Sequence, residues 1–416
     1  MRPKHIVLVD GLWVGHHPTY VKTFAKVLLD AGYRVSVLCP APDEVLSEVG
    51  YSSVVDEQRL IACQFSDQMP KIIPFLPTRL CNPFMSLARW MRVSRALRAI
   101  RSFSGRPDLV FFAWLDSYVT GYLPVRFIGW LFPFYWTGLY FHPRHWRNAG
   151  RNGKPQQGWF ALPEQFLVKS KWASSIAVLD AGIVDALRAE LAGKPVVVLP
   201  DFTDEVLPSE RCALVEEIQS KAKGRTIIGL LGGLARRKGL LTLIRIAKQS
   251  HEMPWCFVFA GVLLEETFTK EELIEVRTFF STERENCFFF LRKIPDDAQF
   301  NAVFNVCDVI FAMYENFPHS SNLVTKAAIF GKNILVSCGG YMEEVVLKYE
   351  LGEAVRAGDV EGAIRALHGL ADAITSIGRW EHMQEYARSQ SQGELRKAIL
   401  MLVERSMPEV SLKQEV

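Results

Sequence analysis

The chain has 416 residues, 49% of them hydrophobic and 22% charged, and a formal net charge of +3 at pH 7. This composition excludes an extensively disordered protein, and the nearly balanced charge gives no support to a general nucleic-acid binder. A chain of this length rarely folds around one core, so we expect two domains.

The cysteine pattern argues against a zinc site. The chain has no Cys-x-x-Cys pair and no Cys/His cluster, and its cysteines are scattered at Cys39, Cys63, Cys81, Cys212, Cys256, Cys287, Cys307 and Cys338. Several lie inside apolar runs, which favours buried, reduced thiols. The first apolar run is too short for a signal peptide. We therefore expect a cytoplasmic protein.

Strands and helices alternate along the first 200 residues. Helices are expected at 21–32 and 181–193, and apolar strands at 5–10, 34–40, 108–114, 134–141, 174–180 and 195–200. This alternation predicts a parallel sheet covered by helices, a Rossmann-like domain. The glycine-containing loop after the first strand lacks the Gly-x-Gly-x-x-Gly spacing of dinucleotide sites.

Two segments of this half allow a membrane contact. Residues 122–141 are long enough to span a bilayer, but Arg126, two prolines and two glycines favour a buried short helix followed by a strand. Residues 83–102 carry five arginines spaced three apart and no acid. Each step of three turns back by about 60° on a helix, so the arginines wrap around most of it. We favour an ordinary covering helix, with peripheral membrane contact as the alternative.

After a linker expected at 201–210, the alternation restarts. Strands are expected at 226–232, 255–261, 287–293, 309–314 and 333–337, and helices at 240–249, 272–281, 295–307, 322–330, 361–374 and 380–406. We predict Rossmann-like domains at 1–200 and 207–380, with the helix at about 382–406 packing back on the first. The fold class is α/β, with two doubly wound domains facing across a cleft that suits a small molecule.

The stretch GLLGGLARRKG, residues 229–239, joins a strand to the start of a helix. Backbone N–H groups at a helix N-terminus attract phosphate, and Gly232 and Gly233 allow close backbone approach. Arg236, Arg237 and Lys238 add fixed positive charge suited to a diphosphate, and a loop with surface cations is the alternative.

The loop ENFPHSSN, residues 315–322, follows a strand and leads into another helix. Ser320, Ser321 and Asn322 are candidates for capping that helix, although capping explains only one of them. Glu315 is suited to accept hydrogen bonds from sugar hydroxyls, or it is a solvated loop carboxylate.

Gly15 and His16 lie in the first strand-to-helix loop, and His142 follows another strand of the first half. Such positions are candidates for ligand contact, although a structural histidine is the commoner case. The sequence contains no metal-ligand cluster, Walker A loop or Gly-x-Ser-x-Gly motif.

Taken in order, these segments resemble the GT-B glycosyltransferases, specifically the retaining, nucleotide-sugar-dependent glycosyltransferase family 4. The similarity in organisation covers almost the whole chain and is strongest from 226 to 356. GGLARRKG resembles the family's loop ending in Lys-Gly, CDVIFAMYENFP its strand before Glu-x-Phe-Pro, and AAIFGKNILVSCGGYMEEVV its Gly-Lys-Pro-Val-Val segment. The resemblance implies that Lys238 binds the donor diphosphate and that Gly15 lets the first loop approach the donor closely. It also implies that His142 and Glu315 contact the sugar, and that the amides of Ser320 and Ser321 bind the diphosphate.

Two positions depart from the family pattern. The family's second glutamate, its ribose ligand, falls on Lys326, so we expect Lys326 to add positive charge where the family has negative charge. The family's usual arginine falls on Gly233, and Arg236 or Arg237 would supply its charge from a neighbouring position.

The resemblance implies an enzyme that moves a hexosyl-type sugar from a nucleoside-diphosphate sugar to an acceptor hydroxyl, with retention, in polysaccharide, glycolipid or glycoconjugate biosynthesis. The expected partners are that donor and a sugar, polysaccharide or lipid-linked acceptor, with no nucleic acid. Cations and helix N-termini would stabilise the departing diphosphate, so neither metal nor cofactor is expected. The alternatives are an inactive GT-B protein that binds sugar or nucleotide, or a sugar-nucleotide epimerase.

Overall fold

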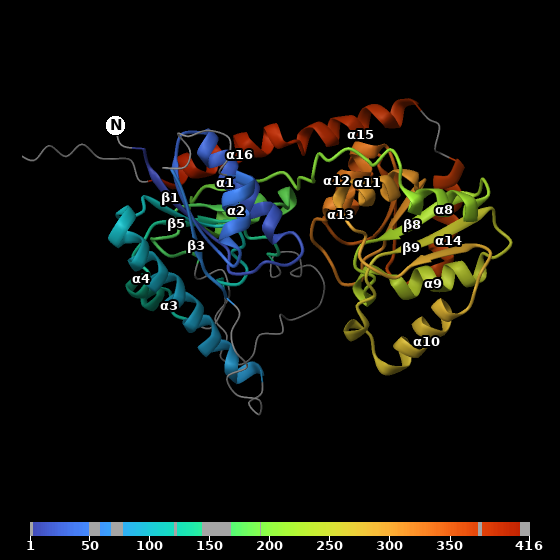
Figure 1. Cartoon of the computed structure of the whole chain (residues 1–416), viewed down its shortest axis with the longest axis horizontal. Coiled ribbons are helices and arrows are strands. Elements are labelled where there is room, and N and C mark those ends of the chain that lie inside the picture. The colour runs from blue at the N-terminus through green and yellow to red at the C-terminus, as the bar shows by residue number, and fades with distance from the viewer. Residues whose placement is uncertain are drawn as a thin grey trace, which may run out of the picture. The chain divides into compact units, whose positions relative to one another are not determined.

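The computed structural model describes residues 3–49, 59–67, 78–119, 123–143, 168–191, 193–372 and 377–407. The chain divides into two compact units, Met1–Pro200 with Gly393–Val416, and Asp201–Gln392 (Figure 1). The expected linker begins the second unit, because Thr325 Oγ1 donates to the Asp201 carbonyl at 2.7 Å. The expected last helix is two helices, α15 (Ile377–Ser389), which packs on α12 (Asn322–Phe330), and α16 (Gln392–Ser406).

The first unit contains a parallel sheet with the strand order β3-β2-β1-β4-β5. Its strands are β1 (His5–Val9), β2 (Arg34–Cys39), β3 (Leu60–Gln64), β4 (Leu109–Phe112) and β5 (Trp136–Gly138), and β6 (Ile176–Val178) pairs separately with β7 (Val196–Val198). Its helices are α1 (His17–Asp30), α2 (Pro42–Val49), α3 (Thr78–Ser104), α4 (Val125–Leu131), the short η2 (Ala181–Ile183) and α7 (Val184–Glu190), besides most of α16. The strands β1, β2 and β4 are buried and mostly apolar, as a sheet covered by helices requires, whereas the edge strand β3 is mostly half-buried.

The two segments considered for membrane contact fold as parts of this unit. Within 123–141 the chain forms α4 and β5, which confirms the predicted helix and strand. Trp90, Val93 and Leu97 of α3 are fully buried in the core that α4 and the sheet share, so one side of α3 covers this core, as predicted. In the described ranges, no helix combines the length and apolarity needed to cross a bilayer.

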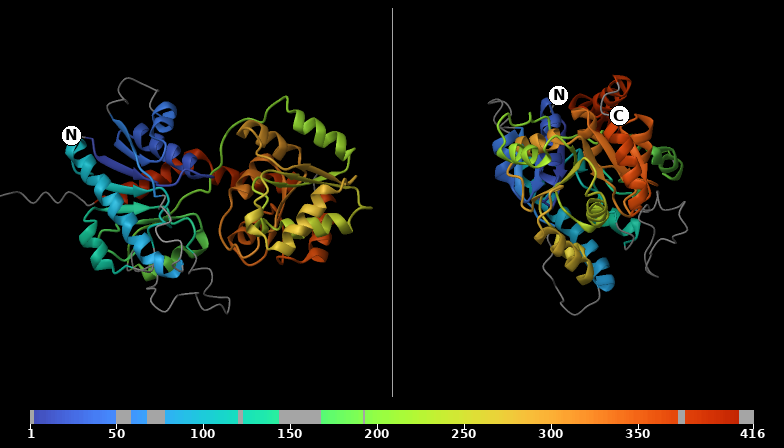
Figure 2. Two further views of the ribbon diagram at one scale, coloured as in Figure 1. Left: turned by 60° about the horizontal axis from the view of Figure 1, so that its bottom comes forward. Right: turned by 90° about the vertical axis from the view of Figure 1, so that its right-hand side faces the viewer.

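The second unit contains a parallel sheet flanked by helices (Figures 1 and 2). Its strand order is β10-β9-β8-β11-β12-β13. Its strands are β8 (Thr226–Leu231), β9 (Trp255–Ala260), β10 (Cys287–Phe290), β11 (Val309–Ala312), β12 (Asn333–Ser337) and β13 (Gly352–Val355). One core lies under α8 (Ala213–Ala222), α11 (Asp297–Val306), α12, α13 (Tyr341–Lys348) and α15. The other lies under α9 (Leu240–Gln249), α10 (Lys270–Ser281) and α14 (Val360–Asp372). Helices thus cover both faces, the doubly wound arrangement that was predicted.

The burial of the cysteines follows from these cores. Cys39, Cys212, Cys256, Cys287 and Cys307 are buried free thiols, as predicted. Burial raises the pKa of both the Cys39 and the Cys287 thiol to about 12, so these side chains behave as small apolar groups.

Candidate functional site

The strand order of the second unit locates a candidate site. Numbered along the chain, its strands run 3-2-1-4-5-6, and the order reverses between β8 and β11. In sheets of this kind, ligands bind at this switch point, beyond the carboxyl ends of the strands. The loops that leave β8 and β11 meet there, because the Glu315 amide donates to the Arg237 carbonyl at 2.7 Å. Both loops are those that the sequence singled out.

Glycines bring the β8 loop close to the strand ends. Gly239 has φ +76°, and a Cβ there would lie 2.4 Å from the Met313 carbonyl oxygen, so a side chain would push the loops apart. Gly232 has φ +90°, and the atom nearest to a Cβ on it would be Lys238 Nζ, at 3.4 Å. The Lys238 ammonium therefore lies over the bare backbone at Gly232. The neighbouring Gly233 has a negative φ and only the Leu264 side chain nearby.

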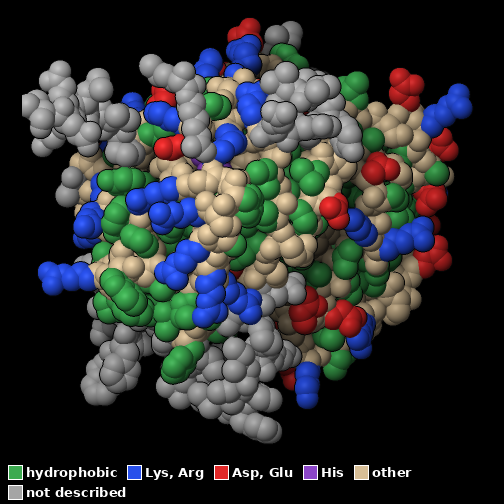
Figure 3. Space-filling view, turned by 60° about the vertical axis from the view of Figure 1, so that its left-hand side comes forward, with side chains coloured by type: hydrophobic (Ala, Val, Ile, Leu, Met, Phe, Trp, Pro, Cys, Tyr) green, Lys and Arg blue, Asp and Glu red, His purple; other side chains and the backbone are tan. Residues whose placement is uncertain are grey.

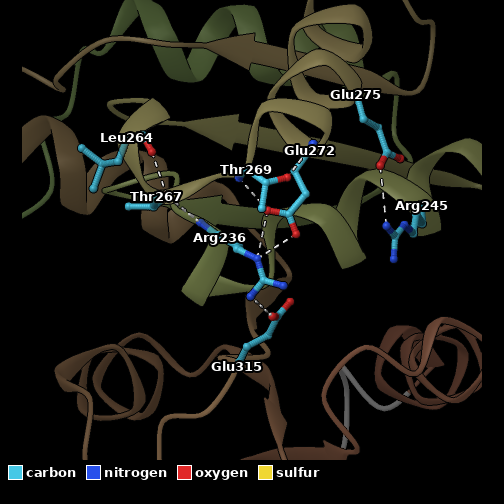
Figure 4. Close-up of polar contacts among 8 residues, drawn as sticks. All are labelled: Arg236, Arg245, Leu264, Thr267, Thr269, Glu272, Glu275 and Glu315. Carbon is cyan, nitrogen blue, oxygen red and sulfur yellow. Dashed lines mark hydrogen bonds and ion pairs between the residues drawn. The ribbon is translucent and has the colours of Figure 1, made fainter.

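Arg236 is held by two carboxylates (Figure 4). Its Nε lies 2.8 and 3.0 Å from the two oxygens of Glu272, and its Nη1 donates to Glu315 Oε2 at 2.9 Å. Glu272 also closes a capping box with Thr269 at the start of α10. The Thr269 amide, and then Arg236, keep the pKa of Glu272 below its usual value. The charge of Arg236 is therefore balanced internally, and the arginine fixes the position of Glu315.

Arg237 and Lys238 have a different environment. Within the described ranges, neither forms an ion pair with a carboxylate. The Arg237 guanidinium carbon lies 4.5 Å from the ring centroid of Phe317, and Lys238 Nζ lies 5.8 Å from that of Tyr314. Aromatic faces orient cations without neutralising them. Two oriented positive charges therefore remain for an anion, beside the start of α9.

The N-terminus of α12 lies at the end of the β11 loop. Ser321 is the N-cap residue and Asn322 the first helical residue, but the Ser321 side chain makes no cap bond, contrary to the expected capping. Ser320 is buried, and its hydroxyl donates to Asp201 Oδ2, so this side chain ties the loop to the start of the second unit. The first amides of a helix lack intrahelical acceptors and can bind an anion.

Lys326, on α12, is 4% exposed. Its Nζ donates to Asp204 Oδ2 at 2.7 Å and to Asn301 Oδ1, while Asn301 Nδ2 donates to Asp204 Oδ1 at 2.7 Å. Burial alone would raise the pKa of Asp204, but hydrogen bonds from Lys326 and Asn301 outweigh it and lower that pKa. The Lys326 charge is thus compensated within the fold, unlike the charges of Arg237 and Lys238.

The remaining candidates lie in the first unit, in loops that follow β1 and β5. Gly15 has φ +60°, a conformation that favours glycine, and the exposed His16 is the N-cap residue of α1. The His142 amide donates to Asp116 Oδ1 at 2.7 Å, and its ring lies edge-on to Trp114. Asp10, which follows β1, and His17, the first residue of α1, are buried with 2.8 Å between Oδ2 and Nδ1, a pair that the sequence analysis did not single out.

Several functional candidates escaped the sequence analysis. Glu272 could have been found, because Thr269-x-x-Glu272 is a capping box in the sequence. Asp204 and Asn301 carry no local signal, since both meet Lys326 from distant parts of the chain. In the part of the chain that the structure describes, no three His, Cys, Asp or Glu side chains are grouped as metal ligands.

The chain resembles known proteins in structure but not in sequence. No protein-family model and no curated protein sequence matches the chain. A glycosyltransferase from Rickettsia africae ESF-5 matches with a TM-score of 0.64 and 10% identity, over 98% of this chain and 100% of that one. Sucrose-phosphate synthase from Thermosynechococcus elongatus and HepE from Anabaena in complex with UDP each match with a TM-score of 0.63 and 14% identity, over 97% of this chain and 99% of theirs. These similarities show that the chain has the GT-B fold, as predicted.

Proposed function

We propose that the chain is a glycosyltransferase that binds a nucleoside-diphosphate sugar in its second unit and transfers the sugar to an acceptor hydroxyl. The observation that carries the proposal is the pair Arg237 and Lys238, which have no carboxylate partner in the described part of the chain and lie at the switch point of a GT-B fold. A diphosphate has the negative charge that these two cations would bind at this position.

Sugar transfer requires that the departing diphosphate be stabilised. The acceptor oxygen bonds to the anomeric carbon as the bond from that carbon to the diphosphate oxygen breaks, and the hydroxyl proton leaves with the diphosphate. Lys238, Arg237 and the starts of α9 and α12 would oppose the negative charge that develops there. Glu315, fixed by Arg236, would accept hydrogen bonds from the sugar hydroxyls. Neither a metal nor a cofactor is part of this proposal.

Finer features rest on the resemblance and on the solved structures. Similarity to family 4 supports retention of the anomeric configuration and a role in polysaccharide, glycolipid or glycoconjugate synthesis. Anabaena HepE has been solved with UDP and with UDP-glucose, and Arabidopsis starch synthase IV with ADP and acarbose. These complexes favour a nucleotide-sugar donor for this chain, with a sugar, polysaccharide or lipid-linked acceptor.

A second candidate function is an inactive GT-B protein that binds a nucleotide or sugar without transferring it. It is favoured by Lys326, which stands where the family has its ribose-binding glutamate and whose ammonium is enclosed by Asp204 and Asn301. A nucleotide bound by this chain would need another ribose contact.

A thermal-shift titration with UDP, GDP, ADP and their common sugar conjugates tests the proposal. A ligand at a hundred times its dissociation constant should add about 2.7 kcal/mol to the free energy of unfolding. We expect one nucleotide series to stabilise the protein, and its sugar conjugate to be consumed in the presence of acceptors. Binding without turnover would support the inactive protein, and donor interconversion without acceptor would support an epimerase. If no nucleotide stabilises the protein, the proposal is wrong.

A further inference from the structure

The solvent-facing side of α3 carries cations that the fold does not use. Arg89 and Arg92 have structural roles, because their Nη1 atoms donate to the carbonyls of Ser117 at 3.3 Å and Ser66 at 3.2 Å. The other three arginines, Arg95, Arg98 and Arg101, are exposed and form no ion pair within the described ranges. Their spacing of three distributes them over about 120° of the helix surface.

The neighbouring helix α4 adds exposed aromatic rings. Trp130 is 77% exposed and Phe127 is 39% exposed, and their ring centroids lie 6.1 Å apart. Arg126, also exposed, precedes them on the same short helix and likewise forms no ion pair among the described residues. An exposed tryptophan beside a phenylalanine is unusual on a surface that meets only water.

The two helices form one surface. Ser94 Oγ of α3 donates to the Leu131 carbonyl of α4 at 2.8 Å, which fixes the helices beside each other (Figures 1 and 2). We call this surface the α3–α4 face and define it by Arg95, Arg98, Arg101, Arg126, Phe127 and Trp130. Neither helix contains an Asp or Glu. The side of the molecule turned forward in Figure 3 shows Lys and Arg side chains lying among hydrophobic ones.

Aromatic residues continue beyond α4. A Cβ on Gly129 would lie 3.1 Å from Cδ1 of Trp172, so the indole packs directly on the helix backbone. Trp172 in turn lies 5.3 Å from the Tyr135 ring, and Lys171 Nζ lies 5.3 Å from the Trp172 ring. The edge of the α3–α4 face therefore has the same combination of cations and amphipathic rings.

We infer that the α3–α4 face binds the surface of a membrane that contains anionic phospholipids. Arginines suit phosphate headgroups, and Trp, Tyr and Phe partition to the headgroup level of a bilayer, where an apolar body and a polar edge are both accommodated. A basic surface with aromatic side chains is the pattern of interfacial helices. Arginines and rings also bind single-stranded nucleic acid, but such sites stack the bases on rings along a charged groove, whereas Trp130 is 77% exposed on a helix surface. The inference does not depend on the proposed sugar transfer, since it needs no substrate.

Cosedimentation with large unilamellar vesicles tests the inference. The full chain should sediment with vesicles of phosphatidylcholine mixed with phosphatidylglycerol, remain in the supernatant with pure phosphatidylcholine, and dissociate as salt is raised. Replacing Arg95, Arg98 and Arg101 with Gln should lower the partition coefficient on the order of a hundredfold, at about fivefold per charge. Trp130→Ala should weaken binding at both low and high salt, because its contribution is not screened.

A matched variant separates this face from overall charge. Arg211, Lys270 and Lys293 are exposed cations of the second unit, and replacing all three with Gln removes the same net charge. This control should bind vesicles as the wild type does, and circular dichroism should show that all variants remain folded. The inference is overturned if the wild type does not bind anionic vesicles, or if both triple variants lose binding equally. It is also overturned if Arg95, Arg98 and Arg101 mediate binding to a single-stranded oligonucleotide but not to vesicles.

Discussion

Lys238→Ala and Arg237→Ala should each weaken the binding of a nucleoside diphosphate. Neither cation has a carboxylate partner in the described part of the chain, so each is free to form a charge-assisted hydrogen bond with phosphate. Such a bond contributes about 1.5–3 kcal/mol, or roughly ten- to a hundred-and-fifty-fold in the dissociation constant. Lys238 is half-buried and Arg237 is exposed, so water screens Arg237 more and its loss should lie at the low end.

Isothermal titration with the nucleotide that gives the largest thermal shift measures both losses. The matched control is Arg245→Ala, on the helix that follows the same loop, because Arg245 faces Glu275 at 3.6 Å and lies apart from Arg236 and Glu315 (Figure 4). Its affinity should equal that of the wild type. If folded Lys238→Ala protein binds with unchanged affinity, or if Arg245→Ala loses as much, the assignment of the phosphates to this loop is refuted.

Three further predictions concern the compensated cations Lys326 and Arg236 and the buried carboxyl group of Asp67 in the first unit. Lys326→Met should lower the free energy of unfolding, measured in urea, by about 3 kcal/mol. This is the low end for a broken buried ion pair, because the Asp204 side chain is 22% exposed. A loss below about 1 kcal/mol would contradict a buried pair. Burial raises the pKa of Asp67 from its ordinary 3.8 to about 6, so between these values the folded protein keeps a proton that the unfolded chain has lost. The contribution of Asp67 to the free energy of unfolding should therefore fall by roughly 3 kcal/mol as pH rises across this interval. The difference between the wild type and Asp67→Asn measures it, and an identical pH dependence in the two proteins would contradict it. Arg236→Ala should lower kcat, because Glu315 loses the partner that fixes its position. The nucleotide dissociation constant should change less than about threefold, the size of effect expected for an exposed ion pair. A larger loss of affinity would show that Arg236 contacts the phosphates.

The fold was predictable where buried runs alternate with helices that have marked ends. The helices Leu240–Gln249 and Asn322–Phe330 were predicted at their observed bounds because glycines mark the start of one and the end of the other. The missed strands Leu60–Gln64 and Gly352–Val355 lie at the sheet edges and are mostly half-buried. An edge strand pairs on one side only, and both strands are short: LIACQ has four consecutive apolar residues and GEAV two, so neither stands out as a buried strand in the sequence.

The candidate site was predictable only in its local part. Residue type and spacing identified a cationic loop with glycines, and its position at a strand end followed from the alternation of elements. Which charges are compensated was not predictable, because Arg236 meets Glu272 across 36 positions and Lys326 meets Asp204 across 122. Pairing over such separations depends on the packing of whole helices. The sequence shows which residues are charged but not the distances that determine which charges pair.

The different environments of Arg236, Arg237 and Lys238 follow from backbone geometry. These residues form the 3-10 helix η3, in which successive side chains point about 120° apart. Three consecutive cations on such a turn cannot all face one ligand, so Arg236 turns to Glu272 on α10, whereas the Arg237 and Lys238 cations both lie over the Tyr314 ring. The arginines of α3 show the converse, because a spacing of three on an α-helix keeps neighbouring cations within about 60° of each other. On the turn at the proposed nucleotide site, one cation of the three is therefore turned away and compensated. On α3, by contrast, Arg95, Arg98 and Arg101 lie within about 120° on the side proposed to meet the membrane.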